Sequence, residues 1–275
     1  MGILNVTPDS FSDGGRFVVG GGRVDGFSRV DVAAAVEAAL LMAEAGADII
    51  DVGGESTRPG SDRVSPDEEQ ARVVPVIEGI RKRSGIPISI DTYKAATALA
   101  AVRAGADIIN DISGLAFDPD MPKAAADSGA ALVVMHIKGT PEDMQKDPRY
   151  EDLMGEVTGF LAAGAEKALL AGVPGDRILV DPGIGFGKTL AHNLELINRL
   201  DELARLGYPV VLGVSRKAFI GRLTGADDPT DRGDGSVAAA VMGIARGAHI
   251  IRAHDVRSAK RAALVADAIM RAGRS

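Results

Sequence analysis

Three stretches of the sequence repeat one pattern: EAGADIIDVG at 44–53, RAGADIINDI at 103–112 and ARGAHIIRAH at 245–254. Each is typical of the end of a helix, a glycine cap and an apolar strand. In this common frame Asp51, Asn110 and Arg252 occupy the same position, and side chains in one register point to the same side of a sheet. We expect that side to be the interior of a barrel. The alternative, that Asp51 only satisfies loop amides, stays open.

Strand-like and helix-like segments alternate about eight times along the chain. Apolar strands are expected near residues 2–6, 48–53, 87–91, 107–112, 131–136, 177–182, 209–215 and 249–254. Helical patterns lie between them, near 30–45, 66–84, 93–104, 120–128, 150–171, 190–206, 232–246 and 256–272. Successive βα units without a long linker predict an α/β fold, a (β/α)8 or TIM barrel, and not an open sheet. We therefore expect residues 1–275 to form a single domain.

Composition narrows the class of protein. With 46% hydrophobic residues, the chain can bury the core of one such barrel. A formal charge of −7 argues against nucleic acid or an anionic membrane as the main partner, because both need clustered positive charge. The absence of Cys excludes disulfides and thiolate ligands. No apolar run reaches the roughly 18 residues of a spanning helix, and no basic leader precedes the first strand, so we expect a cytoplasmic protein.

Polar residues end most of the predicted strands. A strand buried on both faces is normally almost entirely apolar, because each unpaired buried charge costs several kcal/mol. Repeated exceptions at the C-terminal ends therefore predict an active-site rim. The rim residues are Asp91, Asn110, Asp111, Asp181, Ser215, Arg216, Lys217, Arg252, His254 and Asp255. Arg252 and His254, spaced by two, can face one side and are suited to an oxyanion such as phosphate or diphosphate.

Two loops and one glycine-rich motif lie next to this rim in the sequence. Some twenty residues after Asn5 show no periodicity, and GGESTRPG at 53–60 is also polar; long mobile lids are favoured, with solvated surface loops as the alternative. GIGFGKT at 183–189 is preceded by Pro182 where a nucleotide-binding phosphate loop needs Gly, so we predict no nucleotide site there. His136 ends the fifth strand, and either packing or a site role fits it.

Motifs in order along nearly the whole chain resemble the bacterial dihydropteroate synthases of folate biosynthesis. These motifs are MGILNVTPDSFSDGG, DVGGESTRPG, SIDT, IINDISG, VVMHIKGTPEDMQ, LVDPGIGFGKTLAHN, GVSRK and RGDGSVAAAVMGIARGAHIIRAHDV. The resemblance implies a (β/α)8 barrel, a homodimer and a transferase that uses Mg²⁺. It also implies the reaction, in which (7,8-dihydropterin-6-yl)methyl diphosphate and 4-aminobenzoate give 7,8-dihydropteroate and diphosphate. Sulfonamide drugs, which mimic aminobenzoate, would target such an enzyme.

The resemblance implies a role for each matching residue. The pterin contacts match Asp91, Asn110, Met135, Asp181 and Lys217. The diphosphate contacts match Asn5, Thr57, Arg58, Arg252 and His254, and Asn5 also matches the Mg²⁺ ligand. The aminobenzoate pocket matches Phe11, Thr57, Pro59, Phe186, Ser215 and Arg216. The predicted catalytic residues are Asp91, Asp181, Lys217, Arg252 and His254.

The motifs contain no Cys and no Ser–His–acid arrangement, so electrostatic catalysis is favoured over covalent catalysis. Mg²⁺, Arg252 and His254 would stabilise the leaving diphosphate, and Asp91 and Asp181 a cation at the pterin methylene. The chain departs from the family in two places. The segment after Gly15 is longer than the usual form, and Ala218 stands where many members carry a serine that holds the aminobenzoate carboxylate.

Two alternatives within pterin-binding proteins remain. A pterin-dependent methyltransferase shares the Asp and Asn positions but needs neither Lys217 nor the pair formed by Arg252 and His254. A catalytically inactive pterin-binding paralogue should have lost loop or diphosphate residues, all of which are intact here. The residues present therefore favour the synthase.

Overall fold

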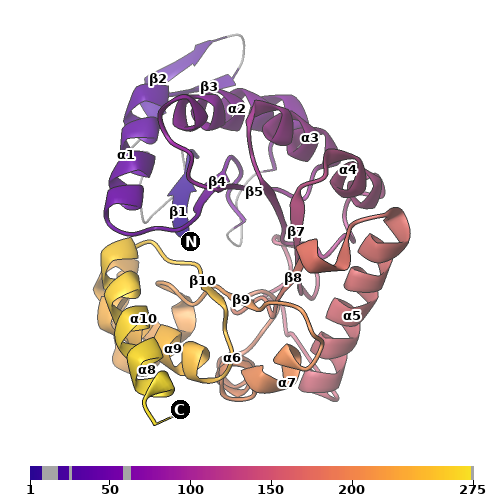
Figure 1. Ribbon diagram of the computed structural model, residues 1–275, viewed down its shortest axis with the longest axis vertical. Helices are drawn as coiled ribbons and strands as arrows, with labels where there is room; N and C mark the ends of the chain where they lie inside the picture. The colour runs from indigo at the N-terminus through magenta and orange to yellow at the C-terminus, as the bar shows by residue number, and fades with distance from the viewer. Residues whose placement is uncertain (8–17, 25–26, 58–62, 274–275) are drawn as a thin grey trace.

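The computed structural model describes the backbone of residues 1–7, 18–24, 27–57 and 63–273, and the side chains of these residues except for 18–29. A ring of strands lies in the middle, and helices surround it (Figure 1). The ring strands are β1 Gly2–Asn5, β4 Ile50–Gly53, β5 Ile88–Asp91, β6 Ile108–Asp111, β7 Ala131–Met135, β8 Ile178–Asp181, β9 Val211–Leu212 and β10 Ile250–Ile251. Each lies inside one of the predicted strand ranges.

The ring closes through parallel pairing. Six strands form one sheet in the order β1-β4-β5-β6-β7-β8, and β10 pairs with β9. Parallel bridges join Val180 to Val210 and Gly2 to Ala253, which connects the two sheets at both ends. The predicted (β/α)8 barrel is therefore confirmed.

Helices cover the outside of the ring. They are α1 Val32–Glu44, α2 Pro66–Arg83, α3 Ala95–Ala104, α4 Met121–Ser128, α5 Leu153–Ala171, α6 Leu190–Asn198, α7 Leu200–Ala204, α8 Ala218–Thr224, α9 Gly233–Ala245 and α10 Val256–Arg271, with 3-10 turns η1 Gly175–Arg177 and η2 Pro229–Arg232. In the repeated pattern Gly46, Gly105 and Gly247 have φ of 102°, 116° and 100°, so the glycine cap is confirmed. None of the helices in the described part of the chain is long and apolar enough to span a membrane.

Alternation along the strands divides the interior into two regions. Ile50, Val52, Ile88 and Ile90 belong to the large cluster that packs strands against helices. A separate small cluster contains Ile108, Val133 and Val211, with Ile49, Ala131, Leu179 and Ile250 packed against it. By the two-residue period these side chains face the lumen, and the next inward positions toward the C-terminal ends include the polar residues Asp51, Asn110, Asp181 and Arg252, beside Met135 and Gly213. The lumen thus has an apolar layer toward the N-terminal ends of the strands and a largely polar layer at their C-terminal ends.

One expectation about the first loop is wrong. Within the stretch expected to lack regular structure, β2 Val18–Val24 pairs antiparallel with β3 Phe27–Val30, with a register irregularity between Val18 and Arg23. The sequence signal for this hairpin is the dipeptide Asp25-Gly26, which is typical of two-residue hairpin connections.

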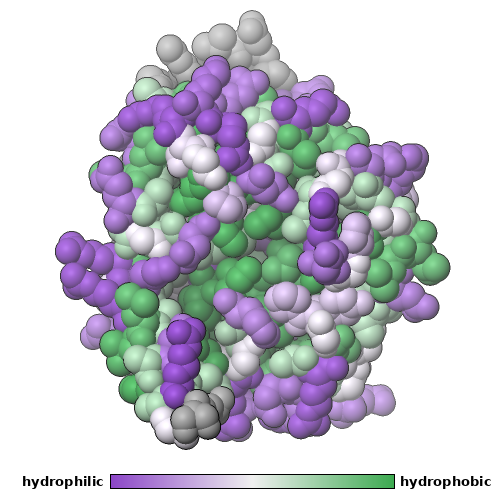
Figure 2. Space-filling view, in the orientation of Figure 1, coloured by the Kyte–Doolittle hydropathy of each residue, from purple (hydrophilic) through white to green (hydrophobic). Residues whose placement is uncertain are grey.

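On the face of the barrel seen in Figure 1, Figure 2 shows hydrophobic residues gathered around the centre and hydrophilic residues mainly toward the edge.

Candidate active site

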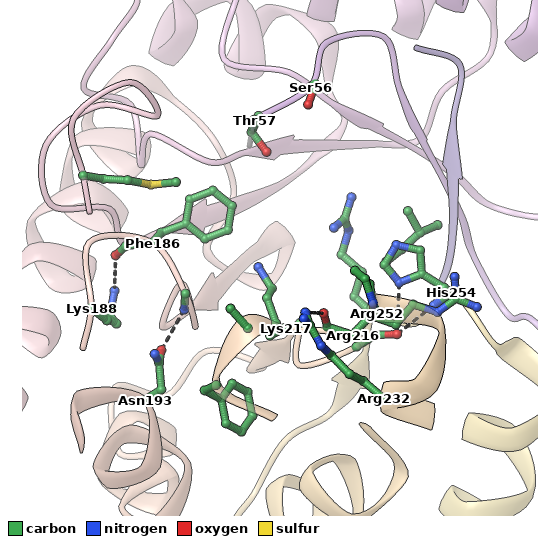
Figure 3. Close-up of a pocket in the computed structure, with 18 of the residues that line it drawn as sticks. Ser56, Thr57, Phe186, Lys188, Asn193, Arg216, Lys217, Arg232, Arg252 and His254 are labelled. Atoms are coloured by element: carbon green, nitrogen blue, oxygen red, sulfur yellow. Dashed lines mark hydrogen bonds between the residues drawn. The ribbon is translucent and has the colours of Figure 1, made fainter. Parts of the chain in front are cut away.

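A pocket of about 570 Å³ opens where the predicted rim lies, at the C-terminal ends of the strands. Its lining contains most of the residues predicted for the site: Asn5, Thr57, Asp91, Phe186, Ser215, Arg216, Lys217, Arg252 and His254. Segments from both ends of the chain and from the middle therefore meet there, as Figure 3 shows. The volume is within the usual range for small-molecule sites.

The other predicted residues divide into two groups. Asn110, Met135 and Asp181 are at least nine-tenths buried at the ends of β6, β7 and β8, and they are not part of the pocket lining. Asn110 pairs in register with Asp91 of the pocket lining, and Asp181, which pairs with Met135, interacts electrostatically with the lining residues Lys217, Arg252 and Lys188. Phe11, Arg58 and Pro59 lie outside the described residues, as do residues 8–17 and 25–26 of the first loop and 58–62 of the second.

Arg252 lies at the centre of a buried charge cluster. Its Nε donates to Asp51 Oδ2 at 2.6 Å and its Nη2 donates to Asp91 Oδ2 at 2.7 Å. Asn110 Nδ2 approaches the same oxygen of Asp51 at 3.5 Å. The three residues that share one register in the repeat therefore meet in the lumen. Because the donors on Asp51 are side chains, the interpretation in which it satisfies loop amides is wrong.

Two carboxylate oxygens in this cluster have no partner in the described part of the chain, and one of them belongs to Asp91, which lines the pocket. Asp51 Oδ1 and Asp91 Oδ1 are buried and have no hydrogen-bond partner among the described residues. Burial raises the pKa of Asp91 to about 7, although Arg252 opposes this. Burial also raises the pKa of Asp181, against the Gly183 amide and the cations Lys217, Arg252 and Lys188. A ligand with N–H donors can pair the free oxygens and favour the ionised forms.

Lys217 and His254 are positioned by neighbouring strands and turns. Lys217 Nζ lies 4.4 Å from the centre of the Phe186 ring, a cation–π contact between two pocket walls that Figure 3 shows. Arg216, before it, has φ of 58°, and its amide donates to Ser236 Oγ at 2.9 Å, which holds this turn. His254 Nδ1 lies 3.0 Å from Ser215 Oγ.

Two predicted rim residues, Asp111 and Asp255, have structural roles instead. Asp111 Oδ1 and Oδ2 accept bonds from the amides of Ser113 and Leu115, so this carboxylate shapes the loop after β6. Asp255 caps α10 by accepting from the Ser258 amide at 3.0 Å. Both residues are acidic and follow a strand, as Asp91 does. Asp111 lies on the other side of β6 from Asn110, and Asp255 lies farther past the end of β10, so neither belongs to the site.

The structure adds site residues that the sequence reasoning did not assign. Lys188, Asn193 and Glu55 line the pocket. Glu55 is fixed at the start of the second loop, because it accepts from Tyr93 Oη at 2.8 Å and pairs with Lys94, which also pairs with the buried Glu69 at 2.9 Å. Lys188 and Asn193 belong to LVDPGIGFGKTLAHN, and because this motif does not fit the nucleotide-loop pattern, the sequence carries no signal that singles out either residue.

Comparison with known proteins identifies the family. Residues 1–254 match the pterin binding enzyme family. The chain is 45% identical to dihydropteroate synthase of Synechocystis sp. over 98% of its own length and 90% of that protein. It is similar, with a TM-score of 0.91 and 43% identity, to the Yersinia pestis dihydropteroate synthase in a sulfonamide drug complex, covering 99% of this chain and 93% of that one.

A second solved structure carries a candidate substrate. The Xanthomonas albilineans dihydropteroate synthase with 4-aminobenzoic acid has a TM-score of 0.87 and 44% identity, covering 98% of this chain and 92% of that one. Identity at this level over almost the whole of each protein shows shared descent as well as a shared barrel. The chain therefore belongs to the pterin binding enzymes and, among them, to the dihydropteroate synthase family.

Proposed function

We propose that the pocket joins the methylene carbon of (7,8-dihydropterin-6-yl)methyl diphosphate to the amine nitrogen of 4-aminobenzoate. The bond from that carbon to the diphosphate oxygen breaks, the new carbon–nitrogen bond forms, and the nitrogen loses a proton. The products are 7,8-dihydropteroate and diphosphate. The family relationship supports this reaction, as does the aminobenzoic acid in the Xanthomonas albilineans relative.

The observation that carries the proposal is Asp91 Oδ1, a buried carboxylate oxygen on the pocket wall without a partner among the described residues. A pterin edge is rich in N–H donors, which such an oxygen needs. Asn110 lies beside it in register, and Asp181 at the end of β8 interacts with the same cations, Arg252 and Lys217, so both supply further acceptors, while Lys217 supplies a donor for the pterin carbonyl. Buried polar groups left unpaired cost about 1–3 kcal/mol each, so pairing them favours a ligand with complementary donors.

Charge separation drives the proposed chemistry. As diphosphate leaves, positive charge develops at the pterin methylene, and the carboxylates of Asp91 and Asp181 stabilise it. Arg252 and His254 are proposed to stabilise the leaving group. Since Nε and Nη2 of Arg252 donate to Asp51 and Asp91, its remaining N–H groups would bind the anion, and the same guanidinium would then couple the two halves of the site.

The donor set fits Mg²⁺ only as an ion carried mainly by the substrate. Among the described residues no group of three His, Cys, Asp or Glu could hold a metal, but Asn5, whose side-chain amide can offer an oxygen, belongs to the pocket lining. Mg²⁺ often takes one or two protein oxygens, substrate phosphate oxygens and waters. We propose Asn5 as that protein ligand. When bound, the ion neutralises charge on the diphosphate.

We further propose a homodimer located in the cytoplasm. The side chains of Met242 on α9 and of Leu264 and Ile269 on α10 are exposed, with relative accessibilities of 49%, 60% and 70%. Neighbouring exposed apolar side chains are typical of a subunit interface. Sedimentation velocity tests the dimer, and cell fractionation tests the location.

A diphosphate-release assay tests the reaction. Release is expected only when the pterin diphosphate, aminobenzoate and Mg²⁺ are all present, and 7,8-dihydropteroate should form in equal amount. Methyl transfer from a methylated folate, without diphosphate release, would instead support the methyltransferase. Pterin binding without either reaction would support an inactive paralogue.

A further inference from the structure

We propose that Lys188 is a positioning residue that, together with His136, holds the Phe186 wall of the aminobenzoate pocket in place. This inference rests on the proposed function, because it concerns the binding of the second substrate. Lys188 is not proposed to touch the reacting atoms. It acts through the backbone of the loop between β8 and α6.

Lys188 is buried and has two defined partners. Its side chain extends inward, with only 3% of the residue exposed. Nζ lies 2.9 Å from Nδ1 of His136 and donates to the carbonyl oxygen of Phe186 at 2.9 Å. His136 follows β7, so Lys188 connects the loop after β8 to the end of the neighbouring strand β7. Figure 3 shows the bond from Lys188 to the Phe186 carbonyl. A lysine bound in this way stabilises the contact between two segments inside the protein and is not a surface cation.

The rest of the loop is equally constrained. Asn193 accepts from the Gly185 amide at 2.7 Å, and Tyr150 Oη donates to the Gly187 carbonyl at 2.8 Å. Gly185 and Gly187 have φ of 85° and 63°, and a Cβ at Gly187 would lie 2.4 Å from a backbone oxygen. The two glycines therefore allow a close turn that presents Phe186 to the pocket.

Moving Phe186 would change the pocket directly. Its ring lines the pocket, and the ring centre lies 4.4 Å from Nζ of Lys217. Phe186 therefore forms part of the outer wall and also contacts a residue proposed to bind the pterin. The Lys188 bond to the Phe186 carbonyl fixes the backbone from which this ring projects. Losing that bond should loosen the outer pocket while leaving Asp91, Asn110 and Asp181 on their strands.

The protonation of Lys188 adds a pH signature. Burial lowers the pKa of Lys188 to about 7, with Asp181 on β8 opposing and Lys217 at the start of α8 reinforcing the change. Burial, Lys188 and Lys138 lower the pKa of His136 to about 3, so the imidazole is neutral and its Nδ1 can accept. Below pH 7 the ammonium donates charge-assisted bonds, which are roughly twice as strong as those of a neutral amine. The Phe186 loop should therefore be held less tightly as pH rises through 7.

The kinetic test compares Lys188→Met with Lys167→Met. Lys167 also donates to a backbone carbonyl, that of Leu115 at 2.6 Å, but it lies outside the pocket lining. For Lys188→Met we expect the KM for aminobenzoate to rise roughly tenfold to a hundredfold, with the KM for pterin diphosphate unchanged. The wild-type KM for aminobenzoate should rise as pH increases through 7, and this dependence should vanish in Lys188→Met. Equal changes in both KM values, or none, would overturn the proposal.

A second readout does not depend on activity. Hydrogen exchange in the segment from Gly183 to Gly187 should become roughly tenfold faster in Lys188→Met and stay unchanged in Lys167→Met. If Lys188→Met does not fold, Tyr150→Phe removes another bond to the same loop and should raise the KM for aminobenzoate in the same direction. A wild-type protein that releases no diphosphate would contradict the proposed function. Unchanged hydrogen exchange in the loop of Lys188→Met would contradict only the positioning role of Lys188.

Discussion

Arg252 and Asp51 are 201 positions apart in the chain, yet Nε of the arginine donates to Oδ2 of the aspartate at 2.6 Å. The aspartate is fully buried, and the bond joins the residue after β10 to β4 across the intervening strand β1, where the barrel closes. The same guanidinium also bonds Asp91 at 2.7 Å. A buried cation that bridges two carboxylates orients the donors of a pocket and also depends on both carboxylates for its own stability.

Asp51→Asn should therefore destabilise the protein. Removing one partner of a buried ion pair leaves the other charge uncompensated, and the typical cost is about 3–5 kcal/mol. Because Arg252 keeps its bond to Asp91, we expect the free energy of unfolding, measured in urea, to fall by an amount near the lower end of this range, about 3 kcal/mol. Asp48→Asn is the matched control: its pair with Lys260 is exposed, and such pairs contribute about 1 kcal/mol or less. A similar loss in both variants would contradict a special role for Asp51.

Asp91→Asn and Asp181→Asn should each reduce turnover by about a hundredfold to a thousandfold. That is the usual effect of losing one preorganised electrostatic contact with the transition state. The far-ultraviolet circular dichroism spectrum should be unchanged. Asp107→Asn, an exposed acid at the opposite end of β6, is the control and should keep normal turnover. Near-normal turnover in both site variants would refute the assignment.

Pterin binding should weaken as the solution becomes more acidic than pH 7. The pKa of Asp91 is raised to about 7, so the carboxyl of the free protein is largely protonated below that pH. If pterin N–H donors require the carboxylate, binding releases a proton, and affinity falls roughly tenfold per pH unit below 7. Calorimetry in buffers of different ionisation enthalpy measures the released proton. The dependence should be absent in Asp91→Asn; its persistence there would assign it to another group.

Lys217→Ala should weaken the binding of pterin diphosphate far more than that of aminobenzoate. The lysine is proposed to bind the pterin carbonyl, and its charge also opposes the raised pKa of Asp181. Titration calorimetry with each ligand separates the two effects. Lys138→Ala is a suitable control, because its Nζ also lies over an aromatic ring, that of Tyr150 at 4.1 Å. Unchanged pterin affinity would indicate that Lys217 only begins α8.

Sulfonamide binding should depend on diphosphate. If the loop after Asn5 and the loop GGESTRPG at 53–60 complete the aminobenzoate pocket only over bound dihydropterin and Mg-diphosphate, a sulfonamide binds weakly to the free protein and much more tightly to that complex. Shortening residues 18–28 should then change sulfonamide affinity and leave pterin affinity nearly unchanged. Equal sulfonamide affinity with and without diphosphate would exclude this order of binding.

The sequence by itself determined the architecture and the register of the site. Three copies of a helix end, a glycine cap and a strand placed Asp51, Asn110 and Arg252 at equivalent positions, and the two-residue period of a strand then required them to face one side. Short-range rules suffice for such inferences, because strand alternation and glycine caps depend on neighbouring residues. The hairpin of β2 and β3 is equally local, because the dipeptide Asp25-Gly26 alone favours a two-residue hairpin connection.

Only the tertiary structure decided which polar groups pair. Lys188 reads as a loop lysine in GIGFGKT, and its burial against His136, 52 positions away, depends on β7 and β8 lying side by side. Asp91 and Asp111 both end strands, yet one enters the pocket cluster and the other caps a loop. Burial and pKa are set by all the surroundings of a group, which the folded barrel assembles from distant segments and no local pattern records.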